Sequence, residues 1–183
     1  MKSATQLKAK SRNLSKETGT PVQIIQRNFL FERFLERASI SEYRDSFILK
    51  GGMLIASMIG IDIRATVDLD ATLRGGDIDE NEIRQIVNGI IKINLDDSTA
   101  FSLVDIERTR VESDYPGWRV TLRASFDSIR DTLKLDMTVG DIITPSAVEY
   151  SYKLMFEDRS INLMAYNRKR QVGSHLQNSS RWL

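Results

Sequence analysis

The sequence predicts an α+β protein in which helices cover one face of a mixed β-sheet. Apolar residues recur at helical spacing in several segments before residue 92, and at every second position in three segments after residue 100. In the later segments polar and apolar side chains alternate, so one sheet face should pack against helices while the other stays polar. The chain is long enough for a single domain with a substantial core.

The first predicted helix follows Thr20-Pro21, where a hydroxyl side chain can cap the helix and proline suits its first position. Its core-facing stripe comprises Ile25, Phe29, Phe34 and Leu35. Glu32 and Arg33 lie in the same helix, and we expect them either to form an exposed ion pair or to support a functional site.

Two more helices are expected before the alternating strands. A short strand end at Phe47 leads through Gly51-Gly52 into a helix that ends near Ile59. Asp79 and Glu82 form a capping box in which aspartate replaces the usual serine or threonine. The helix that follows is strongly amphipathic, with an apolar stripe of Ile83, Ile86, Val87, Ile90 and Ile91.

Strands are expected over residues 63–73, 101–111, 118–126 and 132–139. In the last two segments the polar side chains share one face: Arg119, Thr121, Arg123, Ser125, Lys134, Asp136 and Thr138. The opposite face is apolar and consists of Val120, Leu122, Ala124, Phe126, Leu133, Leu135, Met137 and Val139. This alternation predicts a sheet with one buried face and one polar face.

The expected organisation is a basic N-terminal segment over residues 1–19, one domain over residues 20–167 and a tail over residues 168–183. The basic residues of the two ends are Lys2, Lys8, Lys10, Arg12, Lys16, Arg168, Lys169, Arg170 and Arg181. We expect both ends to be solvated, with contact to RNA phosphates as the alternative.

Composition argues against several kinds of protein. The absence of cysteine excludes disulfides, thiol catalysis and cysteine-ligated zinc, and a single histidine argues against a histidine-rich metal site. A net charge of +1 indicates no particular partner. No apolar run approaches the roughly 18 residues that span a membrane, and the polar N-terminus lacks a signal-peptide core. We therefore expect a cytoplasmic protein without membrane contact.

The candidate site centres on Asp68-Leu69-Asp70. Residues i and i+2 of a strand point to one face, so Asp68 and Asp70 should lie side by side while Val67 and Leu69 point into the core. Adjacent carboxylates repel each other unless a cation lies between them, and Mg²⁺ binds such oxygen ligands together with substrate phosphates. A solvated turn that binds no metal is the alternative.

Two further pairs of residues flank these carboxylates in the sequence. Gly51 and Gly52 allow a backbone to approach a phosphate closely and to adopt positive φ. Arg64 and Thr66 should share the face of the two carboxylates. The alternatives are an ordinary turn for the glycines and a structural salt bridge for Arg64.

These motifs, in this order, resemble the AbiEii abortive-infection toxin family, a branch of the polymerase-β-type nucleotidyltransferases. The family pattern is Lys-Gly-Gly, a helix, and then Arg-x-Thr/Ser-x-Asp-Leu/Ile-Asp. The matching residues are Lys50, Gly51, Gly52, Arg64, Thr66, Asp68 and Asp70. The resemblance continues through residues 114–120, 133–136 and 140–145, and it covers the chain from about Gln26 to about Asn167.

The resemblance implies a polymerase-β-like core and Mg²⁺-dependent transfer of a nucleoside monophosphate from an NTP to an acceptor such as tRNA. It also implies a toxin that acts beside a cognate antitoxin. The expected catalytic and metal-binding carboxylates are Asp68, Asp70 and Asp136. The residues expected to bind the nucleotide are Lys50, Gly51, Gly52, Arg64 and Thr66. Two alternatives stay open, namely Asp136 paired with Lys134 at the surface, and Lys50 as a cap of the turn.

Beyond Asn167 the sequence departs from the family pattern, which continues as a helical region with a Glu-Lys pair and a Lys-Asp-x-Tyr-Asp segment. Residues 168–183 are rich in arginine and serine, which is typical of out-of-frame translation. We therefore expect a frameshift or truncation, with a complete short protein as the alternative. The result would be a catalytically impaired remnant that binds nucleotide, RNA or an antitoxin, and whose exposed apolar surface favours self-association.

Overall fold

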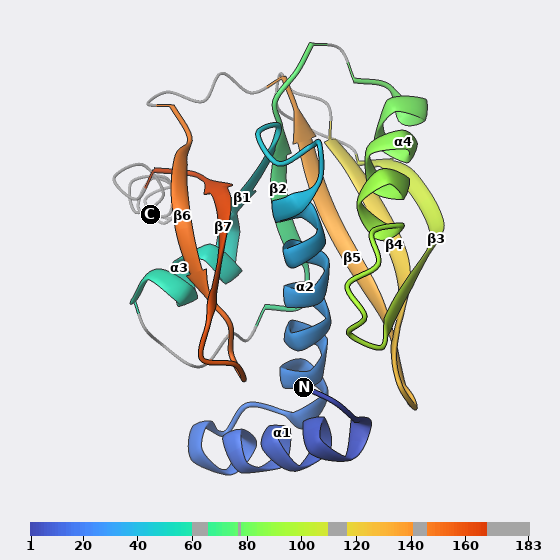
Figure 1. Ribbon diagram of the computed structural model, residues 1–183. Helices are drawn as coiled ribbons and strands as arrows, with labels where there is room; N and C mark the ends of the chain where they lie inside the picture. Colours follow the sequence, from blue (N-terminus) through green and yellow to red (C-terminus); the bar gives the residue numbers. More distant parts are fainter. Residues whose placement is uncertain (60–65, 77, 110–116, 141–145, 168–183) are drawn as a thin grey trace, which may run out of the picture.

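The computed structural model of the chain describes residues 1–59, 66–76, 78–109, 117–140 and 146–167. These residues form an α+β fold with one mixed sheet of seven strands (Figure 1). The strands are β1 (Phe47–Lys50), β2 (Leu69–Leu73), β3 (Thr99–Thr109), β4 (Gly117–Phe126), β5 (Ile129–Val139), β6 (Val148–Lys153) and β7 (Ser160–Ala165). Their order across the sheet is β3-β4-β5-β2-β1-β7-β6.

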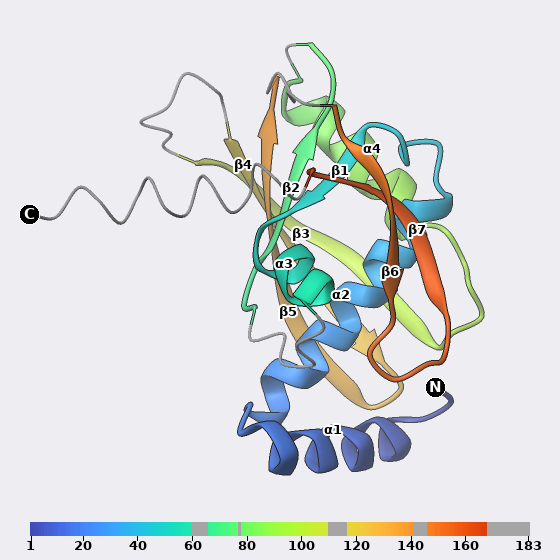
Figure 2. The same cartoon turned by 90° about the vertical axis from the view of Figure 1, so that its left-hand side faces the viewer.

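The described helices are α1 (Ala4–Thr18), α2 (Val22–Ile40), α3 (Gly51–Ile59) and α4 (Glu80–Ile91). The long helix α2 runs along the sheet, and α1 crosses below its first turns (Figures 1 and 2). Phe29 of α2 meets Phe126 of β4 edge to face, with ring centroids 5.0 Å apart. This contact fixes α2 against the apolar face, as the alternating pattern predicts.

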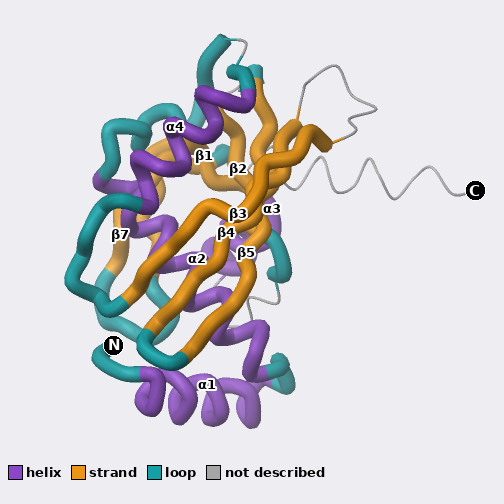
Figure 3. The backbone as a smooth tube through the Cα atoms, turned by 90° about the vertical axis from the view of Figure 1, so that its right-hand side faces the viewer, coloured by secondary structure: helices purple, strands orange, loops and turns teal. Residues whose placement is uncertain are grey.

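The alternation of the central strands is confirmed. The side chains of Val120, Leu122, Leu133 and Leu135 are fully buried. β3, β4 and β5 pair antiparallel in sequence, and β5 then pairs parallel with β2 (Figure 3). The predicted capping box of α4 is also present, because Asp79 accepts from the Glu82 N–H while Glu82 accepts from the Asp79 N–H.

Two predicted boundaries are wrong. α2 begins at Val22, and Pro21 rather than Thr20 takes the cap position without a side-chain hydrogen bond. β2 begins only at Leu69, so Val67 lies in the bend before the strand and is 51% exposed instead of pointing into the core. Successive side chains alternate between the two faces of a sheet only where the backbone is extended, and at Val67 it bends.

Of the two alternatives expected for Glu32 and Arg33, the exposed ion pair is wrong. Both side chains are buried, and each has a different partner. The Glu32 carboxylate accepts from the Met155 backbone N–H at 3.0 Å, while Arg33 donates to Glu157 at 2.9 Å. The hairpin formed by β6 and β7, which was not predicted from the sequence, covers both side chains.

The N-terminal segment is a helix rather than an irregular end. Ser3 caps α1 by accepting from the Gln6 N–H, and Gly19 ends it with φ of 74°. Ala4, Leu7 and Ser11 are buried at helical spacing. Within the described ranges, none of the helices is both long and apolar enough to cross a membrane. Residues 168–183, and with them the expected frameshift, lie outside the described part of the chain.

Candidate active site

One row of charged side chains crosses the polar face of the sheet. Asp70 of β2 is the register partner of Asp136 in β5 and of Lys50 in β1. Asp136 is in turn the register partner of Arg119 in β4. Because register partners in adjacent strands point to the same face, the row reads Lys50, Asp70, Asp136, Arg119. Asp68 directly precedes β2 and joins the row through Arg119.

Arg119 is the residue that holds this arrangement together, although its place in the sequence did not indicate a role in the site. Its Nε and Nη2 donate to the two oxygens of Asp136, both at 2.7 Å. Its Nη2 also lies 3.7 Å from Asp68 Oδ2. The hydrogen bond with Asp136 raises the pKa of Arg119. The alternative that Asp136 pairs with Lys134 at the surface is therefore wrong, because its partner is Arg119.

Asp70 is the least compensated carboxylate of the group. Burial raises its pKa above the ordinary value, and the neighbouring charge of Asp136 raises it further, while Lys50 acts in the opposite direction. An ionised Asp70 thus lies where negative charge is unfavourable. A bound cation would relieve this cost.

The glycine pair lies directly against the carboxylate site. Gly51 has φ of 74°, and a Cβ atom built there would come within 2.1 Å of Asp70 Oδ2. A Cβ atom at Gly52 would come within 2.8 Å of Thr66 Oγ1. Because α3 begins at Gly51, its first backbone N–H groups lack helical partners and are available to an anion.

Three further residues were predicted to bind the nucleotide, namely Lys50, Thr66 and Arg64. Lys50 Nζ donates to Thr138 Oγ1 at 2.7 Å, so its side chain runs along the polar face. The Thr66 carbonyl accepts from Asn28 Nδ2 of α2 at 3.3 Å, which ties the approach to β2 to the helix layer. Arg64 lies outside the described residues.

The donor set fits a divalent cation only in part. The described residues contain no group of three acidic or histidine side chains already arranged to hold a metal ion. Asp136 is not free to act as a metal ligand, because the Arg119 guanidinium is hydrogen-bonded to both of its carboxylate oxygens. Asp68 and Asp70 are oxygen donors two residues apart, which suits Mg²⁺, and Asp136 could join them only after release from Arg119.

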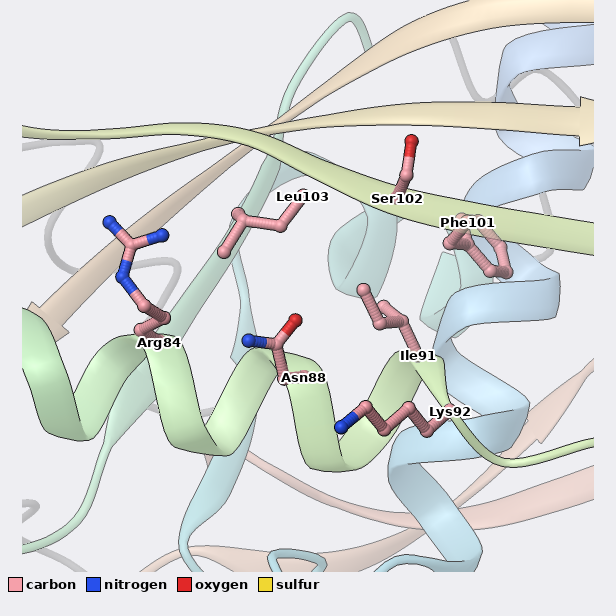
Figure 4. Close-up of a pocket in the computed structure, with 7 residues that line it drawn as sticks. All are labelled: Arg84, Asn88, Ile91, Lys92, Phe101, Ser102 and Leu103. Atoms are coloured by element: carbon pink, nitrogen blue, oxygen red, sulfur yellow. The ribbon is translucent and has the colours of Figure 1, made fainter.

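A shallow hollow between α4 and β3 is separate from this site. It is lined by Arg84, Asn88, Ile91, Lys92, Phe101, Ser102 and Leu103 (Figure 4). Leu103 is the register partner of Leu122, whose side chain belongs to the buried face. The hollow therefore lies across the sheet from the carboxylates.

Residues 33–176 match the protein family described as nucleotidyl transferase AbiEii toxin, type IV toxin–antitoxin system. The chain belongs to this family. The AbiEii match includes every predicted site residue and all seven strands, whereas α1 lies outside it. A search among curated proteins found no match.

Two solved structures from Helicobacter pylori are similar to this AbiEii chain. One is JHP933, with 13% identity and a TM-score of 0.49 over 86% of this chain and 57% of that protein. The other is a candidate nucleotidyltransferase, with 16% identity and a TM-score of 0.48 over 84% of this chain and 58% of that protein. The chain thus spans less than two thirds of the length of either protein.

We predict that Gly51→Ala destabilises the protein more than Gly19→Ala. Both glycines have φ of 74°, but a Cβ at Gly19 meets nothing within 4 Å. Gly19→Ala is the control and should cost only the left-handed backbone strain of about 1–2 kcal/mol. Gly51→Ala should cost this strain plus the collision with Asp70. Urea unfolding measures both, and equal losses would contradict the close approach.

We predict that Asp70→Asn stabilises the metal-free protein at neutral pH. Because the folded-state pKa of Asp70 is raised, wild-type stability falls as the pH rises above the ordinary aspartate value of about 4. The advantage of the asparagine variant should therefore be absent well below pH 4 and grow toward pH 7. Unfolding free energies across this range in EDTA measure it, with the exposed Asp158→Asn as the control for charge loss. A pH-independent difference would contradict the argument.

We predict that Arg119→Gln lowers the free energy of unfolding at pH 7 by about 1 kcal/mol, the value for a half-exposed ion pair. The variant leaves the carboxylates without their shared counterion. In the background of Asp136→Asn the same substitution should cost clearly less. A double-mutant cycle with no coupling energy would show that the pair adds nothing to stability.

Proposed function

We propose that this chain is a Mg²⁺-dependent nucleotidyltransferase that transfers a nucleoside monophosphate from an NTP to an RNA acceptor such as tRNA. The observation that carries the proposal is the convergence of Asp68, Asp70 and Asp136 beside the glycine-rich start of α3. Phosphoryl-type transfer depends mainly on positioning and charge neutralisation, and this site offers groups for both. Membership of the AbiEii family supports the same reaction class.

The carboxylates and the glycine turn take different roles in this proposal. Asp68 and Asp70 hold Mg²⁺, which supplies neutralisation of the triphosphate charge when bound. The free N–H groups at the start of α3, including those of Gly51 and Gly52, bind phosphate oxygens. Lys50 and Thr66 line the approach to the nucleotide, and Arg64, which lies outside the described residues, is proposed from the sequence as a further nucleotide-binding residue. A polymerase-β-like core is part of the same proposal.

Asp136 acts on the acceptor. Its carboxylate accepts the proton of the attacking hydroxyl as the new bond forms between that oxygen and the α-phosphorus. The bond from the α-phosphorus to the bridging oxygen breaks, and pyrophosphate leaves. Arg119 keeps Asp136 oriented before the substrates arrive, because its two hydrogen bonds fix both carboxylate oxygens.

The family description also bears on the biological partner. AbiEii proteins are described as toxins of a type IV toxin–antitoxin system, so we propose that this chain acts as a toxin beside a cognate antitoxin. Action in the cytoplasm and self-association remain predictions from the sequence.

We predict that NTP and Mg²⁺ stabilise the protein together far more than either does alone, because each supplies ligands or charge that the other needs. Asp68→Asn with Asp70→Asn should abolish both this joint shift in melting temperature and the transfer of labelled NMP to total RNA. Asp105→Asn with Asp158→Asn removes two exposed carboxylates elsewhere and should change neither.

The melting-temperature and transfer assays can also contradict the proposal. Equal stabilisation of the wild-type protein by NTP with and without Mg²⁺ would refute the metal-linked site. Nucleotide or RNA binding without any transfer, tested with each of the four NTPs, would instead support the catalytically impaired alternative.

A further inference from the structure

α1 carries an unusual concentration of positive charge. Residues 1–19 contain five basic residues and one acidic residue, so the remainder of the chain contains 21 basic and 24 acidic residues. Lys8, Arg12 and Lys16 are all exposed. Their i, i+4, i+8 spacing places them in one stripe, about 12 Å long at 1.5 Å per residue. Within the described ranges, none of the three side chains forms an ion pair.

The helix that carries this stripe is fixed to the domain. Leu7 is fully buried and Ala4 nearly so. The Ala4 N–H donates to Asp127 Oδ2 in the β4–β5 turn at 2.9 Å, and Lys10 Nζ donates to the Phe156 carbonyl at 3.1 Å. The stripe is therefore held by contacts to two hairpins, so binding a ligand requires no ordering of α1.

A polar path connects this end of the molecule with the carboxylates. From the β4–β5 turn, Arg130, Thr132, Lys134 and Asp136 follow one another on the same face of β5. The first three are exposed. The distance along β5 from Arg130 to Asp136 is about 20 Å at 3.3 Å per residue. Roughly six nucleotides of a helical strand would span it.

We propose that the Lys8–Arg12–Lys16 stripe binds the phosphate backbone of the acceptor RNA and directs its end along β5 toward Asp136. This inference rests on the proposed function, which supplies the acceptor. α1 lies outside the part of the chain that matches the AbiEii family, so membership of the family does not account for this surface.

A nucleic-acid backbone fits this surface better than a membrane does. Interfacial helices insert an apolar face into the lipid, but the apolar side of α1 is buried against the domain. Evenly spaced cations on a rigid helix instead suit phosphate contacts, which position a nucleic acid without reading its sequence.

The test compares two triple variants with the same change in charge. Lys8→Gln, Arg12→Gln and Lys16→Gln remove the stripe while keeping good helix formers. Arg74→Gln, Lys92→Gln and Arg108→Gln remove three exposed basic residues elsewhere. Fluorescence anisotropy with a labelled tRNA, repeated over a range of salt concentrations, gives the affinity and its salt dependence. Circular dichroism and melting temperatures confirm that both variants fold.

We expect the stripe variant to bind the tRNA at least about tenfold more weakly at low salt. Its slope of log K against log salt should be smaller by roughly 2–3, the value for three lost phosphate contacts. The control variant should change affinity less than about threefold. Equal losses in both variants, or unchanged binding in the stripe variant, would overturn the proposal. If the stripe variant loses binding to anionic phospholipid vesicles but keeps its tRNA binding, the proposal is also overturned, and the stripe is instead a membrane-binding surface.

Binding and transfer are measured separately, so failure of this inference differs from failure of the proposed function. Asp68→Asn with Asp70→Asn should retain wild-type affinity for the tRNA while transfer is lost. If transfer persists in that variant, the proposed function fails, whereas the affinities of the stripe and control variants still decide the role of α1.

Discussion

Repulsion among Asp68, Asp70 and Asp136 is the constraint around which the polar face of the sheet is organised. The fold brings three carboxylates together, and it limits the cost with two cations, one in each neighbouring strand of the row. Lys50 flanks Asp70 from β1, and Arg119 flanks Asp136 from β4. The two cations are not equivalent. Arg119 binds Asp136 through two short hydrogen bonds. Lys50 donates a hydrogen bond to Thr138, and the pKa of Asp70 remains raised despite the positive charge of Lys50.

The helix layer supports this face from behind. Arg27 of α2 pairs with Asp131 of β5 at 2.9 Å, and Asn28 in the next position holds the Thr66 carbonyl just before β2. A third α2 residue, Arg37, forms a two-pronged ion pair with Asp97 at the start of β3. One rigid helix thus fixes the start of both strands that carry the site, so their carboxylates keep a constant relative position.

The sequence predicted the parts of the fold whose cause is local. The alternation from Val120 to Phe126 and the capping box at Asp79 depend on neighbours a few positions apart, and both are present. The sequence did not predict β6 and β7, although Val148, Tyr150 and Tyr152 do alternate with polar residues. It also missed α1, whose buried residues number only three and give a weak stripe.

In the candidate site, too, only the features with a local cause were predicted from the sequence. Asp68 and Asp70 are two positions apart in sequence, and glycine at position 51 allows the positive φ that the structure has there. The Asp70 carboxylate also leaves no room for a side chain at that position. The role of Arg119 could not be predicted from the sequence, because its contact with Asp136 depends on the register between β4 and β5. That register brings two residues 17 positions apart into contact. Pairing patterns across a sheet are set by the whole fold rather than by local spacing.

The position of Arg119 also determines how a cation could use the site. A divalent cation that recruits Asp136 must displace a guanidinium from both oxygens of that carboxylate, and the displaced Arg119 then needs another anion. Asp68 lies 3.7 Å away but would itself be bound to the cation. The triphosphate of an incoming nucleotide is the remaining anion that the proposed reaction supplies. Cation binding and nucleotide binding therefore become energetically linked through one arginine, since each removes an obstacle to the other.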